Sequence, residues 1–235
     1  LHDALPIWYF LPLPSLILFI FISAYHFGQS QFLYLPLPER HPLKTLLYLV
    51  WGLFILLALI FFNPQASQEI LQHLLPAYTF SPELLHPLYT WGLGSLYGII
   101  MLLFGYLLTR RIMKPRQFLW EVLNQVVLLS LFHYTSLWIS FAVYFGLWHA
   151  IGSILAEVEI FQAGGRRFDL WTFAKEALPL SLASFAGIGL LLLASTYLES
   201  YFSVYLLFFI AISTLTVPHM YYMQAFYAKG LQRDS

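Results

Sequence analysis

The chain has 235 residues, of which 60% are hydrophobic and only 9% are charged. A soluble domain carries roughly 25% charged residues, so this composition indicates a polytopic membrane protein and excludes an ordinary globular domain. The formal net charge is zero, which gives no basis for binding nucleic acid. The absence of cysteine excludes disulfides, thiolate metal sites, iron–sulfur clusters and cysteine nucleophiles, so a metal must be held by His, Asp or Glu.

Seven apolar runs are long enough to span a bilayer, since a spanning helix needs about 20 mostly apolar residues. We therefore predict an all-α integral membrane protein, a bundle of about seven transmembrane helices that forms a single multi-span domain over residues 1–235. The runs are 7–29, 44–62, 88–109, 117–134, 136–156, 177–197 and 202–228. Pro12 and Pro14 predict that the first helix is kinked or starts late. A very short turn near residues 134–136 joins the fourth and fifth spans.

Charge in the loops predicts the orientation. All 11 Lys and Arg residues follow odd-numbered spans, and none follows an even-numbered one. The positive-inside rule then predicts that the odd-numbered spans end in the cytoplasm, in a multi-pass protein of the cell (inner) membrane. On the other side, residues 64–87 predict a short interfacial helix and a proline-bounded turn. His73 and His86 there, and His41 in a cytoplasmic loop, are predicted to be surface residues.

Three histidines lie within apolar runs on odd-numbered spans: His26, His149 and His219. An imidazole in such a run has no water to hydrogen-bond, so it needs a protein partner or a metal. For any one of them alone, a hydrogen bond to a neighbouring helix is the alternative to a metal.

The expected depths of the three histidines agree. His149 precedes Glu157, the first charge after the fifth span, by eight residues, and His219 precedes Lys229 by ten. At 1.5 Å per residue, both lie within roughly 12–15 Å of the cytoplasmic boundary. His26 reaches a similar level if the first span continues past it for more than a turn. We therefore predict that the three converge on one metal ion.

The neighbours of these histidines suggest how the rings are aimed. Polar side chains that could orient a ligand imidazole through its second nitrogen follow His26 directly, namely Gln29, Ser30 and Gln31. Pro218 precedes His219, where it frees a backbone carbonyl and bends the helix, which is a common way to aim one side chain into a bundle.

Two other polar residues of the fourth span receive different predictions. His133 ends this outward-running span, so it should lie near the opposite face beside Tyr134, outside the metal site. Glu121 is a candidate for a buried polar residue, but it lies close to the preceding basic loop, so snorkelling of its side chain toward that loop is the favoured prediction.

A site of three or four histidines holds a divalent first-row metal with neutral ligands and leaves coordination positions open. Iron(II) with open positions can bind dioxygen. Aromatic residues make up 19% of the chain and could line a pocket for a lipid-soluble substrate. Together these features predict oxygen chemistry on a lipid or isoprenoid, with zinc or a purely structural metal as the alternatives.

Three short motifs occur in the chain in this order: Ser23-Ala-Tyr-His-Phe-Gly28, Tyr144-Phe-Gly-Leu-Trp-His149 and Pro218-His219-Met220. They resemble the SxxHFG, YFxxWH and PHM elements of the Brp/Blh family of membrane β-carotene 15,15'-dioxygenases, over nearly the whole chain. The resemblance implies cleavage of β-carotene, or a related carotenoid, by Fe2+ and dioxygen at the central double bond, giving two retinals. It implies that His26, His149 and His219 are iron ligands. It also implies action within a lipid bilayer and a functional link to a rhodopsin.

The chain departs from the family pattern in three ways. The family's N-terminal PHGxxDH element has no match, which implies a truncated or divergent member that lacks one or more N-terminal helices. Ser153 stands where a second histidine usually follows the WH pair, and Gln31 stands where an acidic residue is usual. The alternative function is therefore a non-catalytic carotenoid-binding relative that has lost metal ligands.

Two other classes of membrane protein fit less well. A di-iron desaturase needs closely spaced histidine clusters, and no two histidines here lie within five residues. A transporter would usually carry charges inside its spans, and this chain has almost none there.

Overall fold

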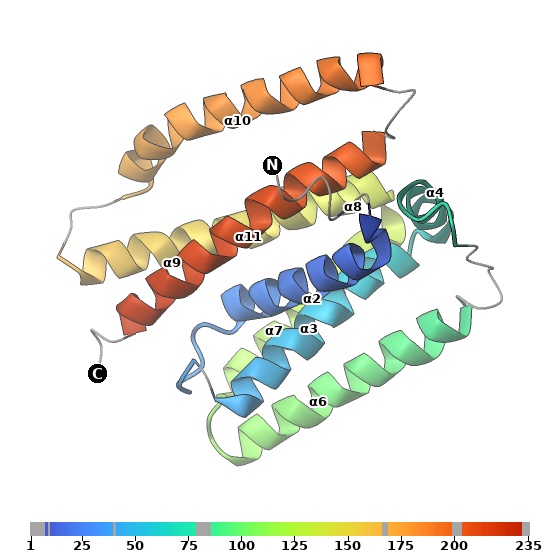
Figure 1. Ribbon diagram of the computed structural model, residues 1–235. Helices are drawn as coiled ribbons and strands as arrows, with labels where there is room; N and C mark the ends of the chain where they lie inside the picture. The colour runs from blue at the N-terminus through green and yellow to red at the C-terminus, as the bar shows by residue number, and fades with distance from the viewer. Residues whose placement is uncertain are drawn as a thin grey trace. The chain divides into compact units, whose positions relative to one another are not determined.

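A computed structural model describes residues 8, 10–39, 41–78, 86–165, 169–198 and 204–231. These residues form helices and connecting turns, and no strand occurs among them. The chain divides into two compact units (Figure 1). The central unit comprises Leu13–Gly152, and the terminal unit comprises Leu1–Pro12 together with Ser153–Ser235.

The central unit is built from a consecutive series of helices. Its elements are α2 (Pro12–Gln31), α3 (Pro42–Phe61), α4 (Pro64–Leu74), the π-helix η1 (Leu88–Gly92), α6 (Leu93–Thr109), α7 (Pro115–Tyr134), α8 (Leu137–Val143), the π-helix η2 (Tyr144–His149) and the start of α9 (Ala150–Ala163). Four of these helices begin at a proline, where the missing N–H would have no intrahelical partner and the fixed φ already suits a helix.

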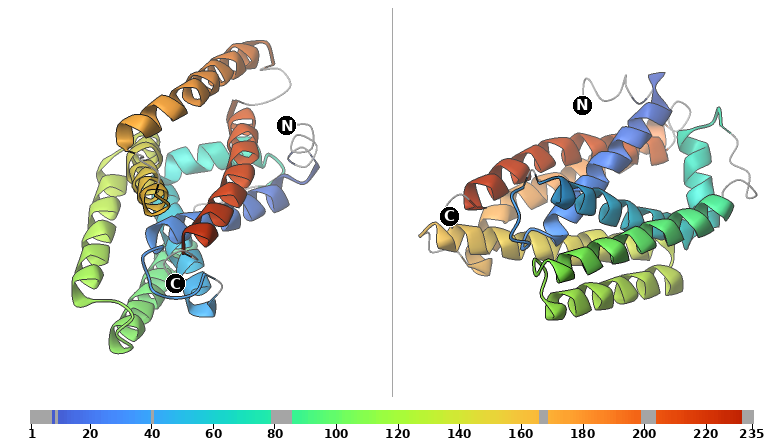
Figure 2. Two further views of the ribbon diagram at one scale, coloured as in Figure 1. Left: turned by 90° about the vertical axis from the view of Figure 1, so that its left-hand side faces the viewer. Right: turned by 90° about the horizontal axis from the view of Figure 1, so that it is seen from below.

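Helix α3 is the centre of this unit. It packs against α4, α6, α7 and α8, and its Trp51, Phe54 and Ile55 side chains are at most 1% exposed. Figure 1 shows α3 lying between α2 and α6, and Figure 2 shows α6 and α7 side by side. The core of the unit is therefore an aromatic layer around α3, and α2 lies directly against it.

Glycine allows α2 and α3 to touch through their backbones. A Cβ on Gly28 would overlap the backbone of Tyr48, and a Cβ on Gly52 would overlap the backbone of Ala24. Helices in apolar surroundings gain packing contacts when small residues let them approach this closely. Each helix contributes one glycine, so the contact depends on both.

Replacing Gly52 with alanine is therefore expected to destabilise the protein by about 1–3 kcal/mol, the usual cost of overpacking. The matched control is Gly98→Ala in α6, where an added Cβ would meet nothing within 4 Å. Alanine is a better helix former than glycine, so the control should be neutral or stabilising by up to about 1 kcal/mol. Thermal unfolding in detergent, followed by tryptophan fluorescence, measures both. Equal stability of the two variants would contradict the close contact.

The terminal unit contains the two long helices α10 (Leu170–Leu198) and α11 (Val204–Leu231), which pack against each other. Trp8 joins α11 by donating a hydrogen bond from Nε1 to Ser213 Oγ, 2.9 Å away. At the start of α10, the Asp169 carboxylate accepts the backbone N–H of Thr172 at 2.8 Å, as N-capping residues do. Hydrogen bonding from Thr172 lowers the pKa of Asp169.

The described residues confirm a helical protein with apolar, membrane-spanning candidates. Among these residues, five helical stretches are long and apolar enough to cross a membrane: Pro12–Gln31, Pro42–Phe61, Tyr89–Thr109, Leu137–Gln162 and Tyr205–Gln224. Helices α7 and α10 cover the predicted fourth and sixth spans but are not among these five. The count of seven spans, their orientation, the single domain over 1–235 and the missing N-terminal helices stay predictions.

Several local predictions are confirmed. Helix α2, which covers most of the predicted first span, begins at Pro12 and continues to Gln31. Only two residues separate α7 from α8, in agreement with the predicted short turn. Helix α4 is the predicted short helix after the second span. Lys44 was counted among the loop charges although it begins the second apolar run, and it lies within the first turn of α3, where it is fully buried.

Candidate metal centre

His26 is fixed in the last turns of α2. Its side chain is only 1% exposed. Two residues further on, Gly28 presses against the backbone of Tyr48 in α3, so α2 cannot shift or rotate freely at this point. The HFG sequence thus combines an imidazole with the glycine that fixes its helix.

His149 is aimed by a local change of helix type. It ends η2, the π-helical stretch Tyr144–His149 between α8 and α9. A π-helix is wider than an α-helix and so changes the direction of the side chains that follow, and such segments are frequent at functional sites. No sequence pattern predicted η2, because its residues are compatible with an ordinary α-helix.

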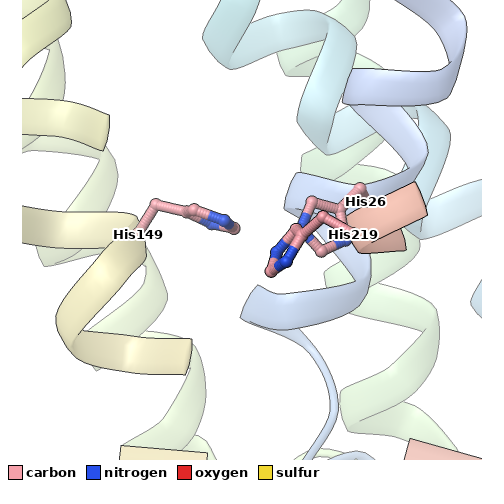
Figure 3. A group of neighbouring side chains, drawn as sticks. All are labelled: His26, His149 and His219. Atoms are coloured by element: carbon pink, nitrogen blue, oxygen red, sulfur yellow. The ribbon is translucent and has the colours of Figure 1, made fainter. Parts of the chain in front are cut away.

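Within the central unit, His26 and His149 face each other (Figure 3). Their ring centroids are 5.1 Å apart and the ring planes are 74° apart. One ring nitrogen of each lies within 4.8 Å of the other. Two nitrogens bound to one ion at about 2.1 Å each lie at most about 4.2 Å apart. The two nitrogens are therefore close enough to bind the same ion after at most a small rotation of one imidazole.

Aromatic rings surround this histidine pair. The Phe27 ring lies edge-on to His149, with centroids 5.0 Å apart. Phe27 also contacts Tyr144 at 5.7 Å and Phe145 at 5.1 Å between centroids. The pair thus lies in a largely apolar environment, which strengthens electrostatic interactions and favours neutral ligands over charged ones.

Polar residues at the end of α2 connect the pair to its surroundings. Ser30 Oγ lies 3.2 Å from His149 Nδ1. The neighbouring Gln31 donates from Nε2 to Glu121 at 2.8 Å, and Gln29 approaches Glu39 at 3.4 Å. The sequence predicted that this polar run could orient the imidazole of the adjacent His26, whereas the contact that the structure gives Ser30 is with His149.

Glu121 corrects one prediction. Its side chain does not snorkel toward the basic loop, because it is only 4% exposed and accepts hydrogen bonds from Gln31 and Tyr34. Tyr34 donates from its hydroxyl at 3.1 Å. Loss of solvation and the adjacent Glu121 carboxylate raise the pKa of Tyr34, so its phenol remains a donor at neutral pH. These two donors hold the carboxylate in place beside the end of α2.

His219 belongs to the other unit. It follows Pro218 inside α11, which continues as a helix through the proline. Its side chain is exposed. Its role as a third ligand to the pair in the central unit therefore stays a prediction.

Four other histidines of the described residues are exposed, and the placement of His133 near the opposite face stays a prediction. His133, near the end of α7, is exposed and contacts the rings of Phe62 and Tyr134. His73, His86 and His41 are exposed as well. His41 caps α3 by accepting the backbone N–H of Leu43 at its Nδ1, 3.2 Å away. None of these four lies with His26 and His149 in the cluster of metal-ligating side chains found among the described residues.

Ser153 lies one turn beyond His149 on α9. It is 7% exposed, and its hydroxyl has no hydrogen-bond partner within the described part of the chain. A serine hydroxyl is a far weaker metal ligand than an imidazole. With serine at position 153, His149 is the candidate metal ligand of this helical segment.

These observations define a class, an all-helical membrane protein that carries a histidine pair in aromatic surroundings, suited to a divalent metal. The chain belongs to the beta-carotene 15,15'-dioxygenase (BCD) family, whose sequence model matches residues 4–227. This match confirms the family expected from the three motifs and implies the enzyme class of carotenoid dioxygenases. No curated protein and no solved structure matched the chain.

Proposed function

We propose that the protein cleaves β-carotene at its central 15,15' double bond, using iron(II) and dioxygen, to give two molecules of retinal. The observation that carries this proposal is the approach of His26 and His149 within the central unit, with ring nitrogens within 4.8 Å of each other. Family membership supports the substrate class. The two oxygen atoms of one dioxygen become the two aldehyde oxygens, so the cleavage balances without an external reductant.

The proposed iron ligands are His26, His149 and His219. Bound iron(II) with open positions supplies the binding of dioxygen, and three neutral imidazoles leave such positions open. The support for His219 is its place in an apolar helix directly after Pro218 and its expected depth, which equals that of His149. The pair in the central unit is the fixed part of this set.

The aromatic residues have a separate role in the proposal. Phe27 covers one edge of His149 and contacts Tyr144 and Phe145. Such rings exclude water from the imidazoles and offer an apolar surface to a polyene. The substrate would enter from the lipid of the cell (inner) membrane, and the retinal formed would be available to a rhodopsin.

Expression in a bacterium that makes β-carotene tests this function. We expect retinal in the cells and bound iron in the purified protein. The matched control is His133→Ala, which alters an exposed histidine outside the site and should leave both readouts unchanged. A protein that yields no retinal and binds no iron would refute the proposal.

Ser153 favours one second candidate, a carotenoid-binding relative without turnover. Its buried hydroxyl stands one turn from His149, where a further imidazole would strengthen metal binding. Bound carotenoid without retinal would support this candidate. Appearance of retinal in the Ser153→His variant alone would show that the fold supports cleavage and that the missing ligand had removed it.

A further inference from the structure

Ser30 makes two hydrogen bonds with one hydroxyl group. Its Oγ lies 3.0 Å from the backbone carbonyl oxygen of Phe27, one turn earlier in α2. The same oxygen lies 3.2 Å from Nδ1 of His149, which reaches it from η2. The serine therefore connects the backbone of one helix to the ring of a histidine on another, entirely within the central unit.

One arrangement of protons satisfies both contacts. A serine hydroxyl has a single proton and two lone pairs, and a carbonyl oxygen only accepts. The Ser30 proton must therefore go to the Phe27 carbonyl. The remaining contact is a hydrogen bond only if His149 donates its Nδ1–H to Ser30 Oγ. A neutral imidazole has one N–H, so Nε2 is then the nitrogen that carries the lone pair.

We propose that Ser30 is a positioning residue that holds His149 in the Nδ1–H tautomer and directs its Nε2 lone pair toward the metal ligand site beside His26. The role of Nε2 as a metal ligand rests on the proposed function of the protein. The proposal extends that function by naming Ser30 as the residue that fixes the His149 ring. Histidine ligands commonly donate their other N–H to an oxygen acceptor in this way, which fixes the tautomer and raises ligand basicity.

The turn that carries Ser30 is itself held from several sides. Gln31 donates to the buried Glu121 at 2.8 Å, and Gly28 is fixed against Tyr48. Rotation of the last turn of α2 would break these contacts together. The Ser30 hydroxyl is therefore presented to His149 in a fixed direction, which a mobile side chain at a helix end would not achieve.

The tautomer can be read directly in the metal-free protein. Two-bond 15N–1H correlation spectra of histidine-labelled protein in lipid nanodiscs distinguish the two neutral tautomers, and the His149→Ala variant assigns the signals of His149. We expect the Nδ1–H pattern in the parent and a mixture of both tautomers in Ser30→Ala. Ser30→Thr, which keeps a hydroxyl able to bond a carbonyl in its own helix, should restore the parent pattern.

The matched control is Ser181→Ala in α10. It removes a serine hydroxyl that bonds its own helix carbonyl, at Ala177, without a histidine partner. It should leave the His149 signals unchanged. An Nε2–H pattern in the parent, or a parent-like pattern in Ser30→Ala, would overturn the proposal.

Binding of Fe2+ under anaerobic conditions gives a second readout. Loss of a partner that orients a histidine ligand lowers metal affinity by roughly 10- to 100-fold, and we expect this range for Ser30→Ala. An unchanged affinity would show that Ser30 does not position the ligand. If the parent binds no metal, the proposed function fails, whereas the tautomer spectra still decide the role of Ser30.

Discussion

His149→Ala and His26→Ala should each abolish iron binding. Each variant removes one of two imidazoles whose nitrogens lie within 4.8 Å of each other. No carboxylate or thiolate joins this cluster among the described residues, so no other protein group there can take the lost position. Alanine adds no polar atom, so the fold of the central unit should persist. Iron content of the purified variants, measured by atomic emission, provides the test.

His133→Ala and His73→Ala are the controls for this prediction. Both remove an exposed histidine, and both should keep the iron content of the parent. Comparable iron content in the His149→Ala variant and in these controls would eliminate the proposed site. The His219→Ala variant decides a further point, since we expect it to lose iron as well. Retention of iron in that variant alone would leave the pair in the central unit intact but remove His219 as a ligand.

Hydropathy predicted the helices well, because each helix must be apolar over a length that matches the bilayer. The runs at 44–62 and 88–109 agree with α3 and with η1–α6 to within a few residues. The π-helical turns did not follow from any local signal. A π-turn forms where tertiary packing favours a changed side-chain direction, and a single sequence does not show that packing.

The sequence predicted those features of the candidate site that depend only on the depth of a residue in the membrane. It did not predict contacts with side chains from distant parts of the chain. His26 and His149 were expected at one level and face each other in the central unit. The prediction for Glu121 was wrong, because it considered the adjacent basic loop and not Gln31 and Tyr34, which lie about ninety residues earlier. For the same reason, no sequence pattern indicated that Lys44 would be buried.

Lys44 has a contact for each of its three ammonium hydrogens. Nζ donates to the backbone carbonyls of Leu35 and Leu37 at 3.2 and 3.1 Å. It also forms an ion pair with Glu39 Oε1 at 2.5 Å, while the lysine side chain is 0% exposed. Glu39 in turn accepts the Tyr48 hydroxyl at 3.2 Å. The connection between α2 and α3 is thus closed around one buried cation.

Lys44→Met is therefore expected to lower the free energy of unfolding by about 3 kcal/mol, the lower end of the cost of breaking a buried ion pair. The lower end applies because the Glu39 side chain keeps 19% exposure, so water can partly solvate the carboxylate left behind. The matched control is Lys175→Met in α10, whose exposed lysine lies over the Trp171 ring at 5.2 Å. A surface change of that kind costs within about 0.5 kcal/mol.

The double variant Lys44→Met with Glu39→Gln separates a charge effect from a packing effect. Removing both charges leaves no uncompensated carboxylate, and replacing a whole buried pair is often close to neutral. We expect the double variant to recover most of the stability that Lys44→Met loses, as measured by thermal unfolding in the same detergent. If the double variant is as unstable as Lys44→Met, the loss arises from the two carbonyls of the α2–α3 connection. If Lys44→Met is as stable as Lys175→Met, the buried cation does not hold that connection together.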